Sequence, residues 1–81
     1  MDWNQTHNRD RAMQWVAVES SFIEAVAYER GDHVLWLRFY DGRTYQYQDV
    51  PAEVYTDLLD AEWKGRFFNL EIKEIYACVR L

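Results

Sequence analysis

The stretch VLWLRFYDGRTYQYQ, residues 34–48, decides the fold. Its two halves are rich in aromatic and branched side chains, which is typical of strands, and the Asp-Gly pair between them is a strong hairpin signal. A similar segment, FIEAVAYE, lies before this stretch at residues 22–29. A short break that contains a glycine separates the two. Breaks this short allow only antiparallel pairing. We therefore predict a meander of three strands at residues 22–29, 34–39 and 43–48.

The length of the hairpin loop decides which side chains of the last strand face the core. With a three-residue loop at 40–42, the glycine takes a left-handed conformation in a bulged turn. Tyr45 then lies opposite the apolar Leu37. Tyr47, the next residue on that face, lies opposite Leu35. In this register the two tyrosines belong to the core and the polar side chains between them face water.

A two-residue loop at 41–42 would exchange the faces. Trp36, Tyr45 and Tyr47 would then form an exposed platform that could stack single-stranded bases. The same register would bury the Thr and Gln side chains of the last strand, and each buried unpaired amide costs about 1–3 kcal/mol. We therefore favour the three-residue loop.

The apolar period becomes helical after residue 50. Pro51 suits the first turn of a helix, where its missing N–H leaves no bond unmade, so that a helix is predicted over 51–61. A second helix over 64–73 is indicated by Phe68 and Ile72, four residues apart. Residues 12–18 fit a strand or a helical turn equally well, and residues 74–81 fit a final strand or a packed tail. The predicted fold is α+β, a three-stranded antiparallel β-meander packed against one or two C-terminal helices.

The composition fits one small domain. The chain has 81 residues, and four Trp, six Tyr and four Phe supply fourteen rings. Each ring can bury about 150–250 Å², so no metal or disulfide is needed for a core. A single cysteine and no apolar run long enough for a bilayer lead us to expect a soluble, cytoplasmic protein without a membrane partner. We predict a polar N-terminal arm with room for a short element at residues 1–17, and a single domain at residues 18–81.

Charge is distributed unevenly on a chain whose formal net charge is −5. Residues 49–62 carry five acidic and no basic side chains, whereas residues 63–81 carry four basic against two acidic ones. The overall charge argues against nonspecific nucleic-acid binding by the whole surface, because attraction to phosphate depends on clustered Lys and Arg. Lys64 and Arg66 could hold a phosphate at a helix N-terminus, with Asn69 reading a base edge. Alternatively, these cations only neutralise the acidic helix before them.

No catalytic or metal-binding constellation stands out. His7, His33 and Cys78 are each isolated in the sequence, so that no metal site is predicted. The serine pair at 20–21 could form a nominal triad with His33 and Asp32, but no nucleophile elbow is present. Serines before a strand more often bond to nearby backbone. We therefore expect no enzyme and no cofactor, and we expect Cys78 to be a small buried side chain.

Three segments resemble a known family in order and spacing. They are VESSFIEAVAY at residues 18–28, RFYDGRTYQYQDVP at residues 38–51 and KGRFFNLEIK at residues 64–73. Together they resemble the KTSC domain, a small domain named for its occurrence at the C-terminus of some lysyl-tRNA synthetases and also found as a stand-alone bacterial protein. One departure is Trp63, where the family often has Ser.

The resemblance implies no established reaction, although RNA binding has been suggested for the family. It also identifies motif residues for which we expect mainly structural roles: Ser20, Ser21, Tyr45, Tyr47, Pro51, Gly65 and Phe68.

Two functions of different classes follow from the sequence. The first is a non-catalytic module that binds RNA through a basic segment and a polar sheet face, with the candidate residues Lys64, Arg66, Asn69, Trp36, Arg38 and Arg43. The second is a protein-interaction or homodimer assembly module that uses exposed aromatic residues such as Trp36 or Trp63. The net negative charge and the acidic helix favour the second.

Overall fold

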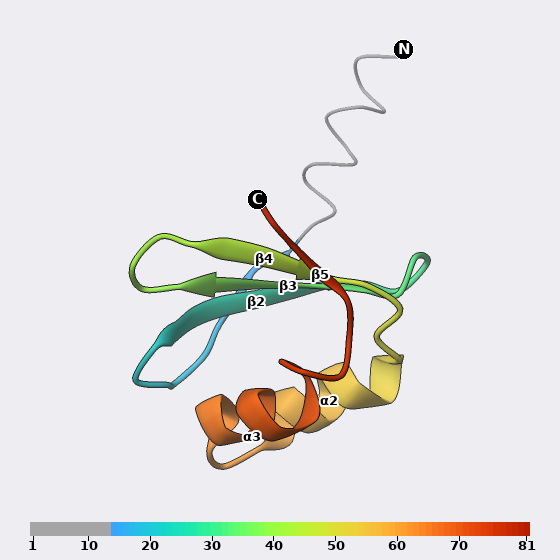
Figure 1. Ribbon diagram of the computed structural model, residues 1–81. Coiled ribbons are helices and arrows are strands. Elements are labelled where there is room, and N and C mark those ends of the chain that lie inside the picture. The colour runs from blue at the N-terminus through green and yellow to red at the C-terminus, as the bar shows by residue number, and fades with distance from the viewer. Residues whose placement is uncertain (1–13) are drawn as a thin grey trace.

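A five-stranded antiparallel sheet lies on two helices. The structure, a computed structural model, describes residues 14–81. Both helices cover the same face of the sheet (Figure 1). In spatial order the strands are β1 (Val16–Ala17), β2 (Ile23–Glu29), β3 (Val34–Phe39), β4 (Thr44–Tyr47) and β5 (Cys78–Arg80), and the helices are α2 (Ala52–Asp60) and α3 (Lys64–Glu71).

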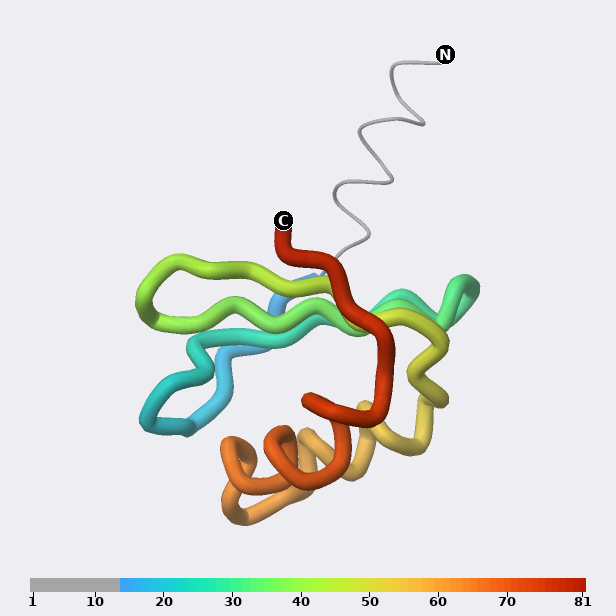
Figure 2. The backbone as a smooth tube through the Cα atoms, in the orientation of Figure 1, coloured from blue at the N-terminus to red at the C-terminus, as the bar shows by residue number. Residues whose placement is uncertain are grey.

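The α+β class and the central meander are confirmed, and two short edge strands extend the sheet. β1 and β5 fall in the two segments whose structure the sequence left open. Figure 2 shows how the chain returns from α3 to the sheet. There it forms β5, which pairs with β4. Most of the predicted polar arm, residues 1–13, lies outside the described residues.

The register of the β3–β4 hairpin is the predicted one. Leu37 pairs with Tyr45, and Leu35 pairs with Tyr47. Gly42 has a φ of +95°, and its N–H closes the turn onto the carbonyl at the end of β3 at 2.9 Å. The three-residue loop is therefore confirmed, and the register that would expose both tyrosines is excluded.

The core lies between the central strands and the two helices. Leu35 and Leu37 of β3 are fully buried, and Leu58 of α2 and Ile72 after α3 cover them from the other layer. Tyr47 is only 3% exposed, as is Phe68 of α3. Each fully buried aliphatic or aromatic side chain stabilises the folded state by about 1.5–3 kcal/mol. Because the core of this domain is small, its stability depends on few such side chains.

Both helices differ from the prediction at their ends. Pro51 has ψ of 150°, an extended conformation, so that it is the N-cap of α2 and not part of its first turn. Its carbonyl still accepts the first helical hydrogen bond, from the Val54 N–H at 3.0 Å. α3 ends two residues early because Ile72 leaves the helical conformation as its side chain enters the core. Within residues 14–81, neither helix is long and apolar enough to span a membrane.

Gly42→Ala is expected to lower the free energy of unfolding by about 1–2 kcal/mol, because left-handed backbone penalises a Cβ. The space around Gly42 adds nothing, since no heavy atom lies within 4 Å of where that Cβ would be. Gly31→Ala is the control, because its φ is outside the left-handed region and a Cβ there would meet only the end of the flexible Glu29 side chain, at 3.3 Å. Its effect should be smaller than that of Gly42→Ala by about 0.5 kcal/mol or more. Urea unfolding measures both. Equal stabilities would contradict the bulged three-residue loop.

Candidate binding cleft

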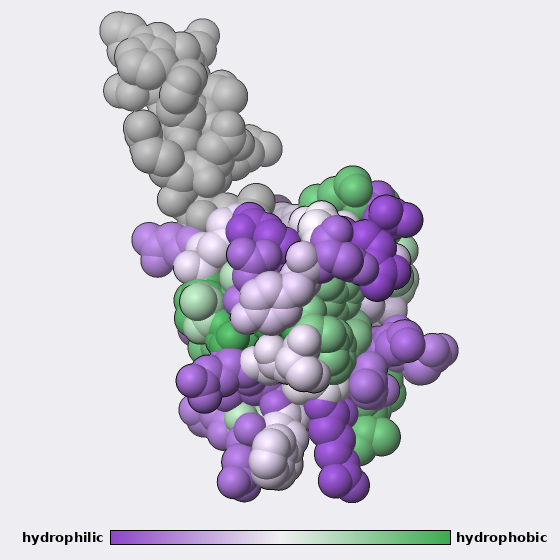
Figure 3. Space-filling model, turned by 90° about the vertical axis from the view of Figure 1, so that its left-hand side faces the viewer, coloured by the Kyte–Doolittle hydropathy of each residue, from purple (hydrophilic) through white to green (hydrophobic). Residues whose placement is uncertain are grey.

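A cleft opens where the β3–β4 hairpin, the turn before β2 and α3 meet. Its volume is about 620 Å³, within the range of about 300–1,000 Å³ typical of small-molecule sites. Figure 3 views this end of the molecule and shows apolar surface set back between hydrophilic groups. We therefore take this cleft as the candidate binding site.

Aromatic side chains from four segments form the walls of the cleft. The Phe68 ring centroid lies 5.8 Å from that of Phe39 and 5.7 Å from that of Tyr47. Phe22 lies 6.0 Å from Phe39, and Tyr45 lies 5.7 Å from Phe39 on the hairpin side. Aromatic pairs at such distances add about 0.5–1.5 kcal/mol each beyond their burial. The walls are thus held together by their own contacts before any ligand arrives.

Tyr47 is almost fully buried and is one of the residues that line the cleft. Burial raises the pKa of Tyr47 well above its ordinary value and is the largest cause of the shift. The neighbouring Cys78 is the next cause. The phenol is therefore protonated at physiological pH and able to donate a hydrogen bond.

Cys78 also lines the cleft, paired with Tyr47 across β4 and β5. Its side chain is exposed, so that the expectation of a buried Cys78 is wrong. The reason is that β5 is an edge strand, which the rest of the sheet covers on one side only. Its position at the sheet edge was not visible in the sequence, because residues 74–81 showed no clear period.

Charged groups from two elements surround the mouth of the cleft. Arg43 Nε donates a hydrogen bond to Asp41 Oδ2 at 2.7 Å, and the guanidinium lies 5.7 Å from the Phe39 ring centroid. The pKa of Asp41 is lowered, mainly because its carboxylate accepts a hydrogen bond from the Arg43 backbone N–H. Lys73 and Glu74, which follow α3, also line the mouth. Because the Arg43–Asp41 pair is exposed, an anionic ligand can compete with Asp41 for Arg43.

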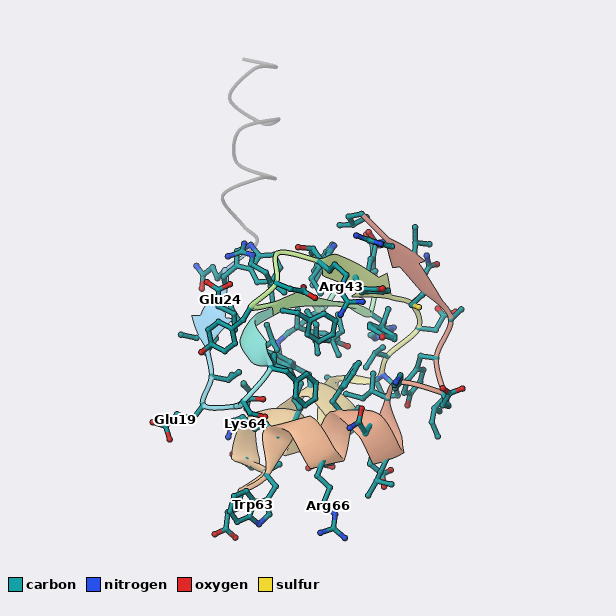
Figure 4. The ribbon with its side chains drawn as sticks, turned by 60° about the vertical axis from the view of Figure 1, so that its left-hand side comes forward. Glu19, Glu24, Arg43, Trp63, Lys64 and Arg66 are labelled. Atoms are coloured by element: carbon teal, nitrogen blue, oxygen red, sulfur yellow. The ribbon has the colours of Figure 1, made fainter. Side chains whose placement is uncertain are left out.

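A second hollow of about 870 Å³ adjoins the cleft and shares Ser21, Phe22 and Asn69 with it. Lys64 and Arg66 line this hollow. Lys64 Nζ donates a hydrogen bond to the Ala61 carbonyl at 2.8 Å, which ties α3 to the end of α2. Arg66 extends away from the body of the domain (Figure 4). The structure therefore brings Lys64, Arg66 and Asn69 to one end of the molecule, with Lys64 partly engaged in holding the fold.

Trp36 and Arg38 lie on the opposite face of the sheet. Leu35 and Leu37 point to the helices, and strand alternation turns the residues between and after them away. The Arg38 guanidinium lies 4.1 Å from the Trp15 ring centroid, in a cation–π contact. The polar sheet face and the cations of α3 consequently do not form one surface. Of the three predicted sheet residues, Arg43 is the one that lines the cleft.

Three more of the motif residues lie in or beside the walls of the cleft. Ser20 Oγ accepts hydrogen bonds from the N–H groups of Phe22 and Ile23 at 3.2 and 3.1 Å. Gly65 leaves room for the Phe22 side chain, since a Cβ at position 65 would lie 2.5 Å from an edge atom of the Phe22 ring. Ser21, which is exposed, lines the cleft itself.

The nominal triad does not form. Asp32 and His33 lie in the turn after β2, whereas the serine pair at 20–21 precedes it. The strand between them spans about 20 Å at 3.3 Å per residue. The part of the chain that the structure describes contains no group of three or more His, Cys, Asp or Glu side chains placed to hold a metal ion.

Sequence reasoning missed several residues of the cleft. Phe22 and Phe39 were expected only as strand residues, and Asp41 only as part of a turn. Lys73, at the mouth, was not a candidate. Their position in the three motif segments is the signal that could have identified these residues. Phe22 directly follows the serine pair, and Lys73 is the last residue of the third segment.

Comparison with known proteins settles which family this is. The chain matches the KTSC domain over residues 19–76, which is more than half of its length. It belongs to the KTSC domain family. The description of the family names no reaction.

Other proteins with KTSC-like sequences occur alone and within a larger enzyme. A protein from Tsukamurella paurometabola is 50% identical over 64 residues, which cover 79% of this chain and 96% of that protein. The crystal structure of a KTSC domain protein from Yersinia pestis has a TM-score of 0.80 and 36% identity, and covers 85% of this chain and 97% of that one. A lysine-tRNA ligase from Nostoc is 42% identical over 55 residues, which are 68% of this chain and only 10% of the ligase.

Proposed function

We propose that this KTSC domain is a non-catalytic module that binds single-stranded RNA along the cleft and the adjoining hollow. The observation that carries the proposal is the aromatic-walled cleft with Arg43 and Lys73 at its mouth. Single-stranded nucleic acid is bound by such a combination, in which rings stack bases and cations contact the backbone. The presence of a similar segment in a lysine-tRNA ligase supports RNA as the partner.

The charge distribution favours this end of the molecule over the rest of the surface. Four cations line the two hollows, namely Arg43, Lys64, Arg66 and Lys73, against the four anions Glu19, Asp41, Glu62 and Glu74. These hollows are therefore neutral overall, and the net charge of −5 is carried by the remainder of the chain. A phosphate backbone is repelled less here than elsewhere.

The salt dependence of RNA affinity tests the proposal. We expect log affinity for a short single-stranded RNA to fall linearly with log salt, with a slope of about −0.7 per phosphate contact. Two to four contacts give a slope between about −1.4 and −2.8. Fluorescence anisotropy at several salt concentrations measures it, and no binding at about 50 mM salt would contradict RNA binding.

A second candidate is assembly through the outer side of α3, where Trp63 is 68% and Leu70 61% exposed. Large exposed apolar side chains are enriched at protein interfaces. Sedimentation equilibrium in the same buffer separates the two candidates. A monomer that binds RNA supports the first, and a dimer without RNA affinity supports the second.

A further inference from the structure

One residue that lines the cleft is a nearly buried tyrosine. Tyr47 is 3% exposed and is among the lining residues. Its hydroxyl lies beside the thiol of Cys78, which is a weak hydrogen-bonding group. A phenol that can donate and accept hydrogen bonds is thus held beside an aromatic-walled cleft and is largely shielded from bulk water.

Ring surface in the same cleft is also available to a ligand. Phe22 and Tyr45 are half-buried, so that part of each ring is open to the cleft. Asn69 projects from α3 at the rim of both hollows and is exposed. A carboxamide both donates and accepts hydrogen bonds, as the edge of a nucleobase does.

Cations stand at the mouth on two different elements. Arg43 comes from the β3–β4 hairpin, and Lys73 follows α3. Figure 4 shows Arg43 on the sheet side, across from the helix layer. An anionic group attached to a flat ring system can therefore contact Arg43 and Lys73 once the ring system enters the cleft, in competition with the neighbouring Asp41 and Glu74.

We propose that the cleft receives one unpaired ribonucleotide, with its base between the aromatic walls and its phosphate at Arg43 and Lys73. This inference rests on the proposed RNA binding and deepens it. Tyr47 and Asn69 bind the edge of the base, and Phe22 and Tyr45 contact its faces. The site accordingly recognises a single nucleotide unit and does not need a continuous strand.

The test is an NMR titration of the whole chain with each of the four ribonucleoside 5′-monophosphates. Ribose 5-phosphate, which lacks the base, and the free nucleosides, which lack the phosphate, are the matched ligands. We expect at least one monophosphate to shift the amide signals of Ser21, Tyr45 and Asn69. Its affinity should be about tenfold or more above that of either matched ligand, since each of those loses one set of contacts.

Two variants assign the base contacts. Tyr47→Phe keeps the ring and removes only the hydroxyl, and Asn69→Ala changes an exposed side chain. Each should weaken the monophosphate about fivefold or more and leave ribose 5-phosphate unchanged. Tyr55→Phe is the control, because Tyr55 stacks on Tyr28 away from the cleft.

Equal affinity for ribose 5-phosphate and the monophosphates would overturn the inference, as would unchanged affinity in both variants. If an RNA oligomer binds but no monophosphate does, the single-nucleotide site is wrong and RNA binding stands. If neither binds, both are wrong.

Discussion

Phe68→Ala is expected to lower the free energy of unfolding by about 3–5 kcal/mol, the range for removal of a buried aromatic ring. Phe68 is 3% exposed and contacts the rings of Phe22, Phe39 and Tyr47. No other described side chain joins α3 to so much of the cleft wall. For a domain of this size, total stability is about 4–12 kcal/mol, so the variant should be partly unfolded at 25 °C or melt far below the parent.

Urea unfolding followed by circular dichroism measures this loss. The neighbouring Phe67→Ala is the control, because Phe67 is only partly buried and packs beside the core cluster. It should cost less than Phe68→Ala by about 1 kcal/mol or more. A loss below about 1 kcal/mol for Phe68→Ala would mean that the ring is not in the core.

Arg43→Gln combined with Lys73→Gln is expected to weaken RNA binding about 100-fold. Each charge-assisted contact to phosphate contributes about tenfold or more, and the two cations stand on different elements at the mouth of the cleft. The salt slope should also become shallower by about 0.7, because both cations contact the same phosphate. Fluorescence anisotropy with one RNA at two salt concentrations measures both effects.

Arg30→Gln combined with Arg38→Gln makes the same change in net charge away from the cleft. Neither residue lines either hollow, so this variant should keep its affinity within about threefold. If both double variants lose affinity equally, binding follows net charge and the cleft is not the site.

The hairpin was predictable because its determinants are local. Gly42 permits the bulged turn, and the alternation of Leu35 and Leu37 fixes the buried face, which then assigns Tyr45 and Tyr47 to the same side. The two edge strands were not predictable. β1 has two residues and β5 has three, which is too short for a period of two to appear. Their pairing depends on the sheet that is already formed.

The binding site could be predicted only in part, because it depends on long-range packing. Lys64, Arg66, Asn69 and Arg43 do gather at one end of the molecule. Trp36 could have been separated from them in advance, since the alternation that turns Leu35 toward the helices turns Trp36 away. The cleft itself joins the turn before β2, a hairpin and α3, whose proximity no local pattern indicates.

Chemical-shift mapping with a short single-stranded RNA tests the cleft most directly. We predict that the largest backbone amide shifts lie at Ser21, Arg43 and Asn69, with small changes at Trp36 and Arg38 on the opposite face of the sheet. Shifts confined to that opposite face, or no shifts at low salt, would show that the cleft does not bind RNA.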